Sequence, residues 1–414
     1  MSTWFEVENF KSIRKLHIEL RPFMTLVGAN GAGKTNVVQA LSVALDIVTA
    51  GTTAPIELYG GYEQLIRRGK RPARSMRFAL RMPYAAAIRS PKGYGTMQVA
   101  FSLRPHPEGE GAIVADESLR IEDPSGKVLA DVRWSSRGPE GIDLVGLRRL
   151  REGQNLLPLT TNRIEEWLKA REPEVLRLCA LYNVLGLHRP AQRVRRLRLE
   201  SSAVRADSIP GEARGLGAQD LAGKGLPLAI ERLRPRDKPS TMAFKRVLAG
   251  LQEIYSGIED VKTIRFQPGR RALSFKERNI DGELGEASVS DGVMHALALL
   301  VALEEERGHH GILAVEEPEN ALHPWALRRI LELAQDRSGK AGALLVTTHS
   351  PVAVDAVKDP AALFVVEKDP KRGTTVTPAL EKERALRAIL AESGQKLGDV
   401  WLGGTIGGVP RAGT

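Results

Sequence analysis

The sequence predicts an α/β fold built around a phosphate-binding loop, and three observations carry this prediction. Residues 28–35 read Gly-Ala-Asn-Gly-Ala-Gly-Lys-Thr, which fits the spacing G-x-x-x-x-G-K-[ST]. An apolar run at residues 23–27 precedes the loop, and a helical pattern follows it at residues 36–45. Two more apolar runs, residues 311–316 and 342–348, have the composition of buried parallel strands. Together these features predict a P-loop NTPase.

The loop predicts nucleotide binding on physical grounds. Its glycines allow successive backbone N–H groups to point at phosphate oxygens, and Lys34 can reach the β- and γ-phosphates. Thr35 offers its hydroxyl to Mg²⁺, and the following helix adds the positive end of its dipole. The expected cofactors are therefore ATP and Mg²⁺. We expect the phosphates to contact Asn30, Gly31, Ala32, Gly33, Lys34, Thr35 and Asn36.

The segments on either side of the loop predict a strand-rich first lobe. Residues 4–7 and 16–20 have the character of strands, and residues 97–134 contain further short strands separated by turns. A mainly helical insert is expected over residues 143–262, with helical patterns from about 143 to 187 and at 240–255. A strand is expected after it, at residues 263–275. The predicted division is residues 1–142 for the N-terminal ATPase lobe, 143–262 for the insert and 263–414 for the C-terminal ATPase lobe.

The composition restricts the class of protein. The chain has 414 residues, a net charge of +10 and a single cysteine, Cys179, which excludes an internal disulfide and fits a reducing compartment. The sequence contains no run of about 18 apolar residues, so it predicts no membrane-spanning helix. The N-terminus lacks the pattern of a signal peptide. We therefore expect a cytoplasmic protein with no membrane partner.

Two acids follow the buried run at residues 311–315. Carboxylates are costly to bury at a strand end unless they hold a metal or accept a proton. Glu316 is the expected ligand, direct or through water, of the Mg²⁺ that Thr35 also holds. Glu317 is expected to orient and deprotonate the attacking water. A pair of acids that caps the next helix is the alternative interpretation.

Two other short stretches have the chemistry of a phosphate site. His349 follows the apolar run at residues 342–348, where an imidazole would hydrogen-bond the γ-phosphate. Ser290 and Gly292 precede a predicted helix, so they can bind an anion at its N-terminus, and a simple N-cap is the alternative. Gln64 is a candidate for a glutamine that also approaches the nucleotide.

With these motifs in place, the chain resembles an ABC-type ATPase of the RecF, SMC and OLD group. Residues 9–13 and 28–36 resemble the N-terminal strands and the Walker A motif, and residues 290–292 resemble the signature motif. Residues 315–318 resemble Walker B, residues 320–324 the D-loop and residues 348–350 the switch histidine. The resemblance covers most of the chain except roughly residues 85–215. Two departures are Glu316, where such proteins usually carry Asp, and Asp291, where transporters have glycine.

The resemblance implies an ABC/SMC-like ATPase head with composite sites. The Walker motifs of one subunit would bind ATP, and Ser290 and Gly292 of a second copy would close on its γ-phosphate. Lys34, Glu317 and His349 would be the catalytic residues of a homodimer that ATP holds together and hydrolysis releases. Compact relatives of this kind stand beside nucleases or toxins in prokaryotic defence systems, so a separate effector protein is an implied partner.

Three functions remain open at this point. The first is an ATPase switch that licenses an effector in antiviral defence, and the second is a RecF-like repair ATPase that clamps DNA. The third is a scaffold that binds ATP without hydrolysing it, and the presence of Glu317 and His349 argues against that.

A basic segment supplies the argument for a polyanion partner. Residues 64–92 contain nine Lys or Arg and no acid, and part of the run alternates as a strand does. We expect duplex DNA to contact Arg67, Arg68, Lys70, Arg71 and Arg74. An acidic effector, or a basic face that is only solvated, would explain the same run.

Overall fold

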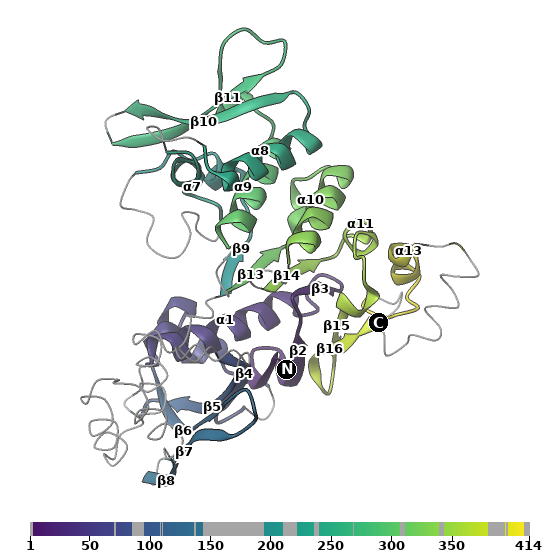
Figure 1. Cartoon of the computed structure of the whole chain (residues 1–414). Helices are drawn as coiled ribbons and strands as arrows, with labels where there is room; N and C mark the ends of the chain where they lie inside the picture. Colours follow the sequence, from purple (N-terminus) through teal and green to yellow (C-terminus); the bar gives the residue numbers. More distant parts are fainter. Residues whose placement is uncertain are drawn as a thin grey trace. The chain divides into compact units, whose positions relative to one another are not determined.

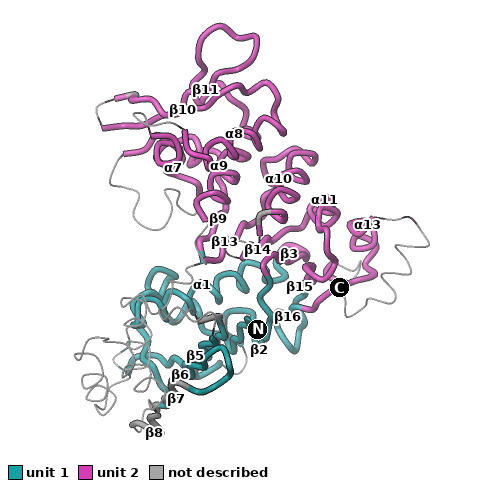
Figure 2. The backbone as a smooth tube through the Cα atoms, in the orientation of Figure 1, with its two compact units in different colours: residues 1–21, 31–194, 367–376 teal, residues 22–30, 195–366, 377–414 magenta. Residues whose placement is uncertain are grey.

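The structure is a computed structural model, which describes residues 3–69, 72–84, 95–107, 109, 111–135, 138–143, 194–209, 222–235, 240–267, 269–306, 311–338, 343–379, 394 and 396–409. The chain forms two compact units, coloured separately in Figure 2. Unit 1 comprises residues 1–21, 31–194 and 367–376, and unit 2 comprises residues 22–30, 195–366 and 377–414. The phosphate loop therefore begins in unit 2 and ends in unit 1.

Unit 1 is an antiparallel sheet with one long helix. Its strands follow the order β8-β7-β6-β5-β4-β1-β2-β16, and helix α1 packs against β1. The aromatic core is continuous across neighbouring strands, because the Phe78 ring lies 6.0 Å from that of Phe10 and 5.3 Å from that of Phe101. The elements are β1 (Thr3–Phe10), β2 (Ile13–Leu20), α1 (Lys34–Ala50), η1 (Ala54–Tyr59), α2 (Tyr62–Leu65), β4 (Met76–Tyr84), β5 (Gly95–Pro105), β6 (Ala112–Glu122), β7 (Val128–Ser135), β8 (Gly138–Asp143) and β16 (Gly373–Pro378).

Unit 2 contains a parallel sheet and the helices that follow its strands (Figure 1). The strands follow the order β15-β3-β14-β13-β9, and β3, β13, β14 and β15 run parallel. Their apolar residues form one core with helices α9 and α10. The elements are β3 (Phe23–Val27), β9 (Val194–Leu197), α6 (Ser201–Val204), α9 (Asp291–Glu305), β13 (Ile312–Glu316), η3 (Pro318–Asn320), α10 (Pro324–Arg337), β14 (Ala343–Thr348), α11 (Pro351–Asp355), η4 (Pro360–Ala362), β15 (Leu363–Asp369) and α13 (Leu397–Leu402).

A smaller antiparallel sheet also belongs to unit 2. Strands β10 (Ile258–Gln267), β11 (Arg270–Glu277) and β12 (Leu284–Gly285) pair in that order, and η2 (Glu286–Ser288) follows. Helices α7 (Leu226–Leu233) and α8 (Met242–Ile254) pack against this sheet and against α9. The same apolar core therefore connects the small sheet to the helix that begins at Asp291.

Most of the expected elements are confirmed, and one is wrong. The helix predicted at residues 240–255 is α8, and the alternating run in the basic segment is β4, whose buried residues include Met76 and Phe78. The single strand predicted at 263–275 is a hairpin of β10 and β11, because the chain turns at Gly269, which has a φ of +78°. The helices expected between 143 and 187 lie outside the described residues, so the three-part division stays a prediction.

No helix in the described part of the chain is both long enough and apolar enough to cross a bilayer.

Candidate nucleotide-binding site

The phosphate loop enters helix α1 through two glycines with left-handed backbone. Gly31 has a φ of +80° and Gly33 a φ of +106°, in the region that side chains with a Cβ rarely adopt. Lys34 is the first residue of α1 and is 5% exposed. The first turn of the helix therefore combines backbone N–H groups with a buried lysine, an arrangement typical of phosphate sites.

A chain of hydroxyl groups supports the loop within unit 1. Asn36 Nδ2 donates to Ser12 Oγ at 2.7 Å, and Ser12 Oγ lies 2.7 Å from Thr374 Oγ1. Thr374 Oγ1 in turn donates to the Ala32 carbonyl at 3.0 Å. A Cβ added to Gly33 would lie 2.1 Å from Thr374 Oγ1, so the close approach of Thr374 requires glycine there. The loop motif gave no sign of Thr374, which is more than 300 residues away along the chain.

In unit 2, the ends of three parallel strands bring the start of the loop beside the predicted catalytic residues. Thr348 pairs with Val27 across β14 and β3, and Glu316 pairs with Thr347 across β13 and β14. The Gly28 N–H approaches the Thr348 carbonyl at 3.4 Å, and the Ala29 N–H donates to the Gly408 carbonyl at 2.9 Å. The carboxyl ends of parallel strands form the usual ligand edge of such sheets.

Glu317 has a backbone conformation that is strained for its residue type. Its φ is 50° and its ψ 54°, the left-handed region that non-glycine residues seldom occupy. The Glu317 N–H donates to the Thr347 carbonyl at 2.9 Å, and Asn320 Nδ2 donates to Glu317 Oε2 at 3.4 Å. Such strain persists only where the surroundings impose it, and it is concentrated at functional sites.

Buried polar atoms gather at this strand end without partners. Among the described residues, Glu316 Oε2, Thr347 Oγ1 and Glu319 Oε2 are buried and accept or donate no hydrogen bond. A buried polar atom without a partner is costly, and each one suggests a ligand, an ion or water. The open carboxylate oxygen of Glu316 is a hard oxygen donor of the kind that Mg²⁺ and its bound water prefer, so the residue fits the predicted role.

His349, the predicted switch histidine, contacts Glu319, an acid that lies outside the motifs recognised in the sequence. Glu319 Oε1 accepts hydrogen bonds from the Thr348 hydroxyl at 2.7 Å and from the His349 N–H at 2.8 Å. His349 Nδ1 lies 3.1 Å from the same oxygen but without hydrogen-bond geometry. Glu319 therefore connects the turn after Walker B to the residue expected to contact the γ-phosphate.

The signature turn is exposed, and an arginine holds it in place. Ser290 is the N-cap of α9, where its side chain accepts from the Val293 N–H at 3.4 Å. Arg205 donates to Asp291 Oδ1 through Nε at 2.9 Å and to the Val289 carbonyl through Nη2 at 2.7 Å. The Arg205 hydrogen bonds hold the pKa of Asp291 below its ordinary value, so its carboxylate stays ionised. Ser290 is thus an N-cap, which is the alternative interpretation of the sequence, and it is exposed.

Gly292 is packed against Tyr255 and the D-loop. A Cβ at Gly292 would lie 2.6 Å from Tyr255 Oη and 3.5 Å from the Ala321 carbonyl oxygen. Burial raises the pKa of Tyr255, which therefore remains a neutral phenol. The signature turn and the D-loop thus meet on one surface of unit 2, and Trp325 nearby along the chain is 53% exposed.

Arginines of β9 and the residues after it face the acids of the site. Arg196 pairs with Glu316 at 2.6 Å, and Arg198 lies 3.4 Å from Glu317 Oε2. Arg195 pairs with Glu305 at the end of α9. In the sequence Arg195, Arg196 and Arg198 form a basic cluster, and their partners lie about 110 to 120 residues away along the chain.

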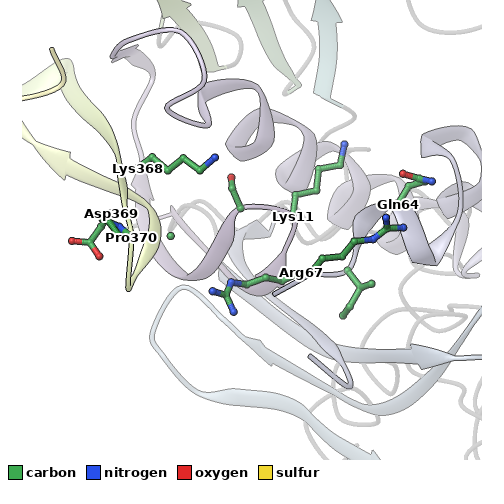
Figure 3. A pocket seen from close by; sticks show the side chains of 10 residues that line it. Lys11, Gln64, Arg67, Lys368, Asp369 and Pro370 are labelled. Carbon is green, nitrogen blue, oxygen red and sulfur yellow. The ribbon is translucent and has the colours of Figure 1, made fainter. Parts of the chain in front are cut away.

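A basic pocket lies in unit 1 (Figure 3), and its lining includes Ser12 from the β1–β2 turn. It has a volume of about 610 Å³. Lys11 from the β1–β2 turn, Arg67 after α2 and Lys368 from the β15–β16 hairpin line it. The N–H groups of Arg372 and Lys371 hold the pKa of Asp369, also in the lining, below its usual value. Gln64 is a lining residue as well, and its assignment as the glutamine of the nucleotide site stays a prediction.

The basic run has acids opposite it in space. Arg77 lies 3.5 Å from Asp116, and Arg81 lies 3.9 Å from Glu122, both across the sheet on β6. Arg68 lines the pocket and Arg74 is exposed, whereas Lys70 and Arg71 lie outside the described residues. The absence of acids in the sequence run therefore does not make the whole strand a basic surface.

The structure has a mixed α/β fold, and its phosphate loop has the motif of P-loop NTPases. Residues 1–47 match a family described as AAA ATPase domain, and residues 241–355 match one described as AAA domain, putative AbiEii toxin, Type IV TA system. These segments include the predicted Walker A motif and the predicted motifs from the signature to the switch histidine, so both parts of the predicted site lie in segments similar to AAA ATPase domains. No curated protein matches the chain.

SMC head domains are among the solved structures that match the chain. An SMC head bound to the C-terminal winged-helix domain of ScpA is 14% identical, with a TM-score of 0.49, over 91% of this chain and 97% of that chain. The SMC head of Pyrococcus furiosus, with an extended coiled coil and bound to the C-terminal domain of ScpA, is 14% identical, with a TM-score of 0.47, over 94% and 99%. The SMC head domain from Thermotoga maritima is 14% identical, with a TM-score of 0.42, over 91% and 98%.

The packing of the signature turn gives the first testable prediction. Gly292→Ala should lower the free energy of unfolding by about 1–3 kcal/mol, as overpacking does, because the new Cβ would meet Tyr255 Oη. The double variant Gly292→Ala/Tyr255→Phe removes that oxygen and should recover the stability of Tyr255→Phe alone. Chemical denaturation of the four proteins measures the coupling. Additive losses would show that Tyr255 does not dictate glycine at this position.

Proposed function

We propose that the protein is an ATP-hydrolysing switch that dimerises on ATP. The observation that carries this proposal is the edge of the parallel sheet in unit 2. There the start of the phosphate loop, the acids after β13 and the histidine after β14 lie at neighbouring strand ends. The strained backbone of Glu317 and the buried polar atoms without partners support a reactive site at this edge.

The phosphate loop would bind the triphosphate, and the pocket in unit 1 would take the nucleoside. Lys34 and the N–H groups of residues 31–35 neutralise the phosphates by charge-assisted hydrogen bonds. Ser12 lines the pocket and also accepts a hydrogen bond from Asn36 of the loop, so the two sites are adjacent. Lys11 and Gln64 there offer polar groups for the base and the ribose.

Thr35 and Glu316 would hold Mg²⁺, which supplies positive charge to the phosphates in the transition state. Glu317 would orient the attacking water and accept its proton, with Asn320 at hydrogen-bonding distance from its carboxylate. His349, held through Glu319, would hydrogen-bond the γ-phosphate and release it after hydrolysis.

The exposed signature turn supports a composite site in a homodimer. Ser290 is exposed at the N-terminus of α9, where backbone N–H groups of the first turn can receive an anion from another molecule. We propose that Ser290 and Gly292 of one copy close on the γ-phosphate bound by its partner. ATP would then hold the dimer together, and hydrolysis would release it.

We further propose that this switch acts in cytoplasmic antiviral defence with a separate effector, such as a nuclease. The match of residues 241–355 to a family described as a putative AbiEii toxin of a type IV toxin–antitoxin system supports this context. The single cysteine fits a reducing compartment.

The Glu317→Gln variant tests hydrolysis. It should bind ATP as the wild type does but hydrolyse it about a hundredfold more slowly or worse, because it lacks the general base. It should also accumulate as a nucleotide-bound dimer. Phosphate release and nucleotide binding are measured in parallel, with Lys34→Ala as the control that should lose binding altogether. Normal turnover by Glu317→Gln would refute the assigned base, and the same measurement on Glu316→Gln would follow.

A RecF-like ATPase that clamps duplex DNA is the second candidate function. Its support is the pair Arg68 and Arg74, which are exposed in unit 1 beside Lys70 and Arg71 along the chain. Arg77 and Arg81, which face acids on β6, are weaker candidates for binding phosphate.

Salt dependence tests the DNA interface. Arg68→Glu/Arg74→Glu should weaken duplex binding regardless of sequence and reduce the slope of log K against log salt by about 0.9 for each phosphate that these arginines neutralise. The control is Lys276→Glu/Lys358→Glu, which changes the net charge equally at two exposed lysines of unit 2. The melting temperature should barely change in either protein. Equal slopes for the two variants would contradict a specific interface, and loss of effector binding alone would favour an acidic partner.

A further inference from the structure

The side chain of Glu316 is held at one oxygen only. Arg196 donates to Glu316 Oε1 through both Nε, at 2.9 Å, and Nη2, at 2.6 Å. The Glu316 side chain is 1% exposed, so this pair is almost fully removed from water. Oε2 of the same carboxylate is buried and has no hydrogen-bond partner among the described residues.

In a second ion pair of unit 2, both oxygens of the buried carboxylate accept hydrogen bonds. Arg246 donates to both oxygens of Glu304, through Nε at 3.1 and 3.0 Å and through Nη2 to Oε2 at 2.7 Å. The Glu304 side chain is 0% exposed, and both its oxygens are used. The contact between Arg196 and Glu316 is therefore not a general result of burial, because the fold satisfies an equally buried carboxylate completely elsewhere.

The open oxygen belongs to the strand end that carries the proposed catalytic residues. Glu316 pairs in register with Thr347, whose hydroxyl is also buried without a partner in the described part of the chain. An unpaired oxygen of a buried carboxylate is expensive unless a ligand or a water completes it. Glutamate also has one more rotatable bond than aspartate, so its position must be fixed by other groups if its oxygen is to meet a metal.

We propose that Arg196 is a positioning residue that fixes Oε1 of Glu316 and so presents Oε2 to the Mg²⁺ side of the nucleotide site. The proposal rests on the proposed function, in which Glu316 helps to hold Mg²⁺. It explains how Glu316 can act as a metal ligand at a position where the resemblance leads one to expect aspartate. Arg196 reaches this position because β9 is the neighbour of β13 in the sheet.

Metal-dependent nucleotide binding tests the proposal without relying on turnover. The full chain is titrated with a fluorescent ATP analogue in EDTA, and then with Mg²⁺ at fixed nucleotide. Arg196→Met should keep the metal-free affinity but raise the half-saturating Mg²⁺ concentration about 10–100-fold, the effect of losing a group that orients a metal ligand. Arg196→Lys, which keeps the charge but not the forked contact, should lie between this variant and the wild type.

Arg246→Met is the matched control, since it removes the arginine of the fully satisfied pair. Its half-saturating Mg²⁺ should equal that of the wild type. A wild-type Mg²⁺ requirement in folded Arg196→Met, or an equal shift in Arg246→Met, overturns the proposal. If Arg196→Met does not fold, Arg196→Lys decides in the same way: a raised requirement supports the proposal, and an unchanged one overturns it. Absence of nucleotide binding by the wild type would overturn the proposed function as well.

Discussion

The buried carboxylate at the end of β13 is the constraint on which the rest of the site depends. An ionised group in an apolar sheet is stable only if opposite charge or hydrogen bonds compensate it, and Glu316 obtains half of this from Arg196. Arg196 supplies this compensation from β9, the neighbour of β13 in the sheet, and the second carboxylate oxygen has no partner among the described residues. The same strand end fixes Glu317 in its left-handed conformation through the Thr347 carbonyl. The contacts that stabilise this strand end therefore also fix the residues that are proposed to act in the reaction.

The segment that follows β9 extends this arrangement to the signature turn. Arg195 pairs with Glu305 at the C-terminal end of α9, and Arg205 holds Asp291 at its N-terminal end. A short stretch of chain thus contacts both ends of the signature helix as well as the Walker B acids. The pairs are expected to differ in strength, because the side chains of Arg195 and Arg196 are only 9% and 16% exposed, whereas that of Arg198 is 54% exposed and screened by water.

A single sequence is enough to predict a motif when the motif depends only on the spacing of neighbouring residues. The phosphate loop, the acids after an apolar run and the serine before a helix each require only neighbouring residues, so they could be located in advance. The alternation in β4 was equally readable, because a period of two fixes which face is buried. The hairpin of β10 and β11 was missed, since its two halves share the same composition and only the turn at Gly269 separates them.

Contacts between distant residues could not be predicted from a single sequence. Nothing near Gly33 points to Thr374, and nothing near Arg77 points to Asp116 on another strand. Arg196 belongs to a cluster of basic residues in the sequence, and such a cluster gives no information about the acids with which its members pair. The sequence gives no role to Glu319, because this residue lies between the predicted Walker B motif and the predicted D-loop and belongs to neither.

The composite site is the central claim, and complementation between two inactive variants tests it most directly. Ser290→Arg should bind ATP but block closure, because a bulky cation fills the pocket for the partner's γ-phosphate, and Lys34→Ala should not bind ATP. In a mixed dimer, one site combines the intact phosphate loop of the first with the intact signature turn of the second. The account predicts that phosphate release from the mixture rises well above the sum of the separate variants. No recovery at any mixing ratio, with mixed dimers shown to form, would contradict it.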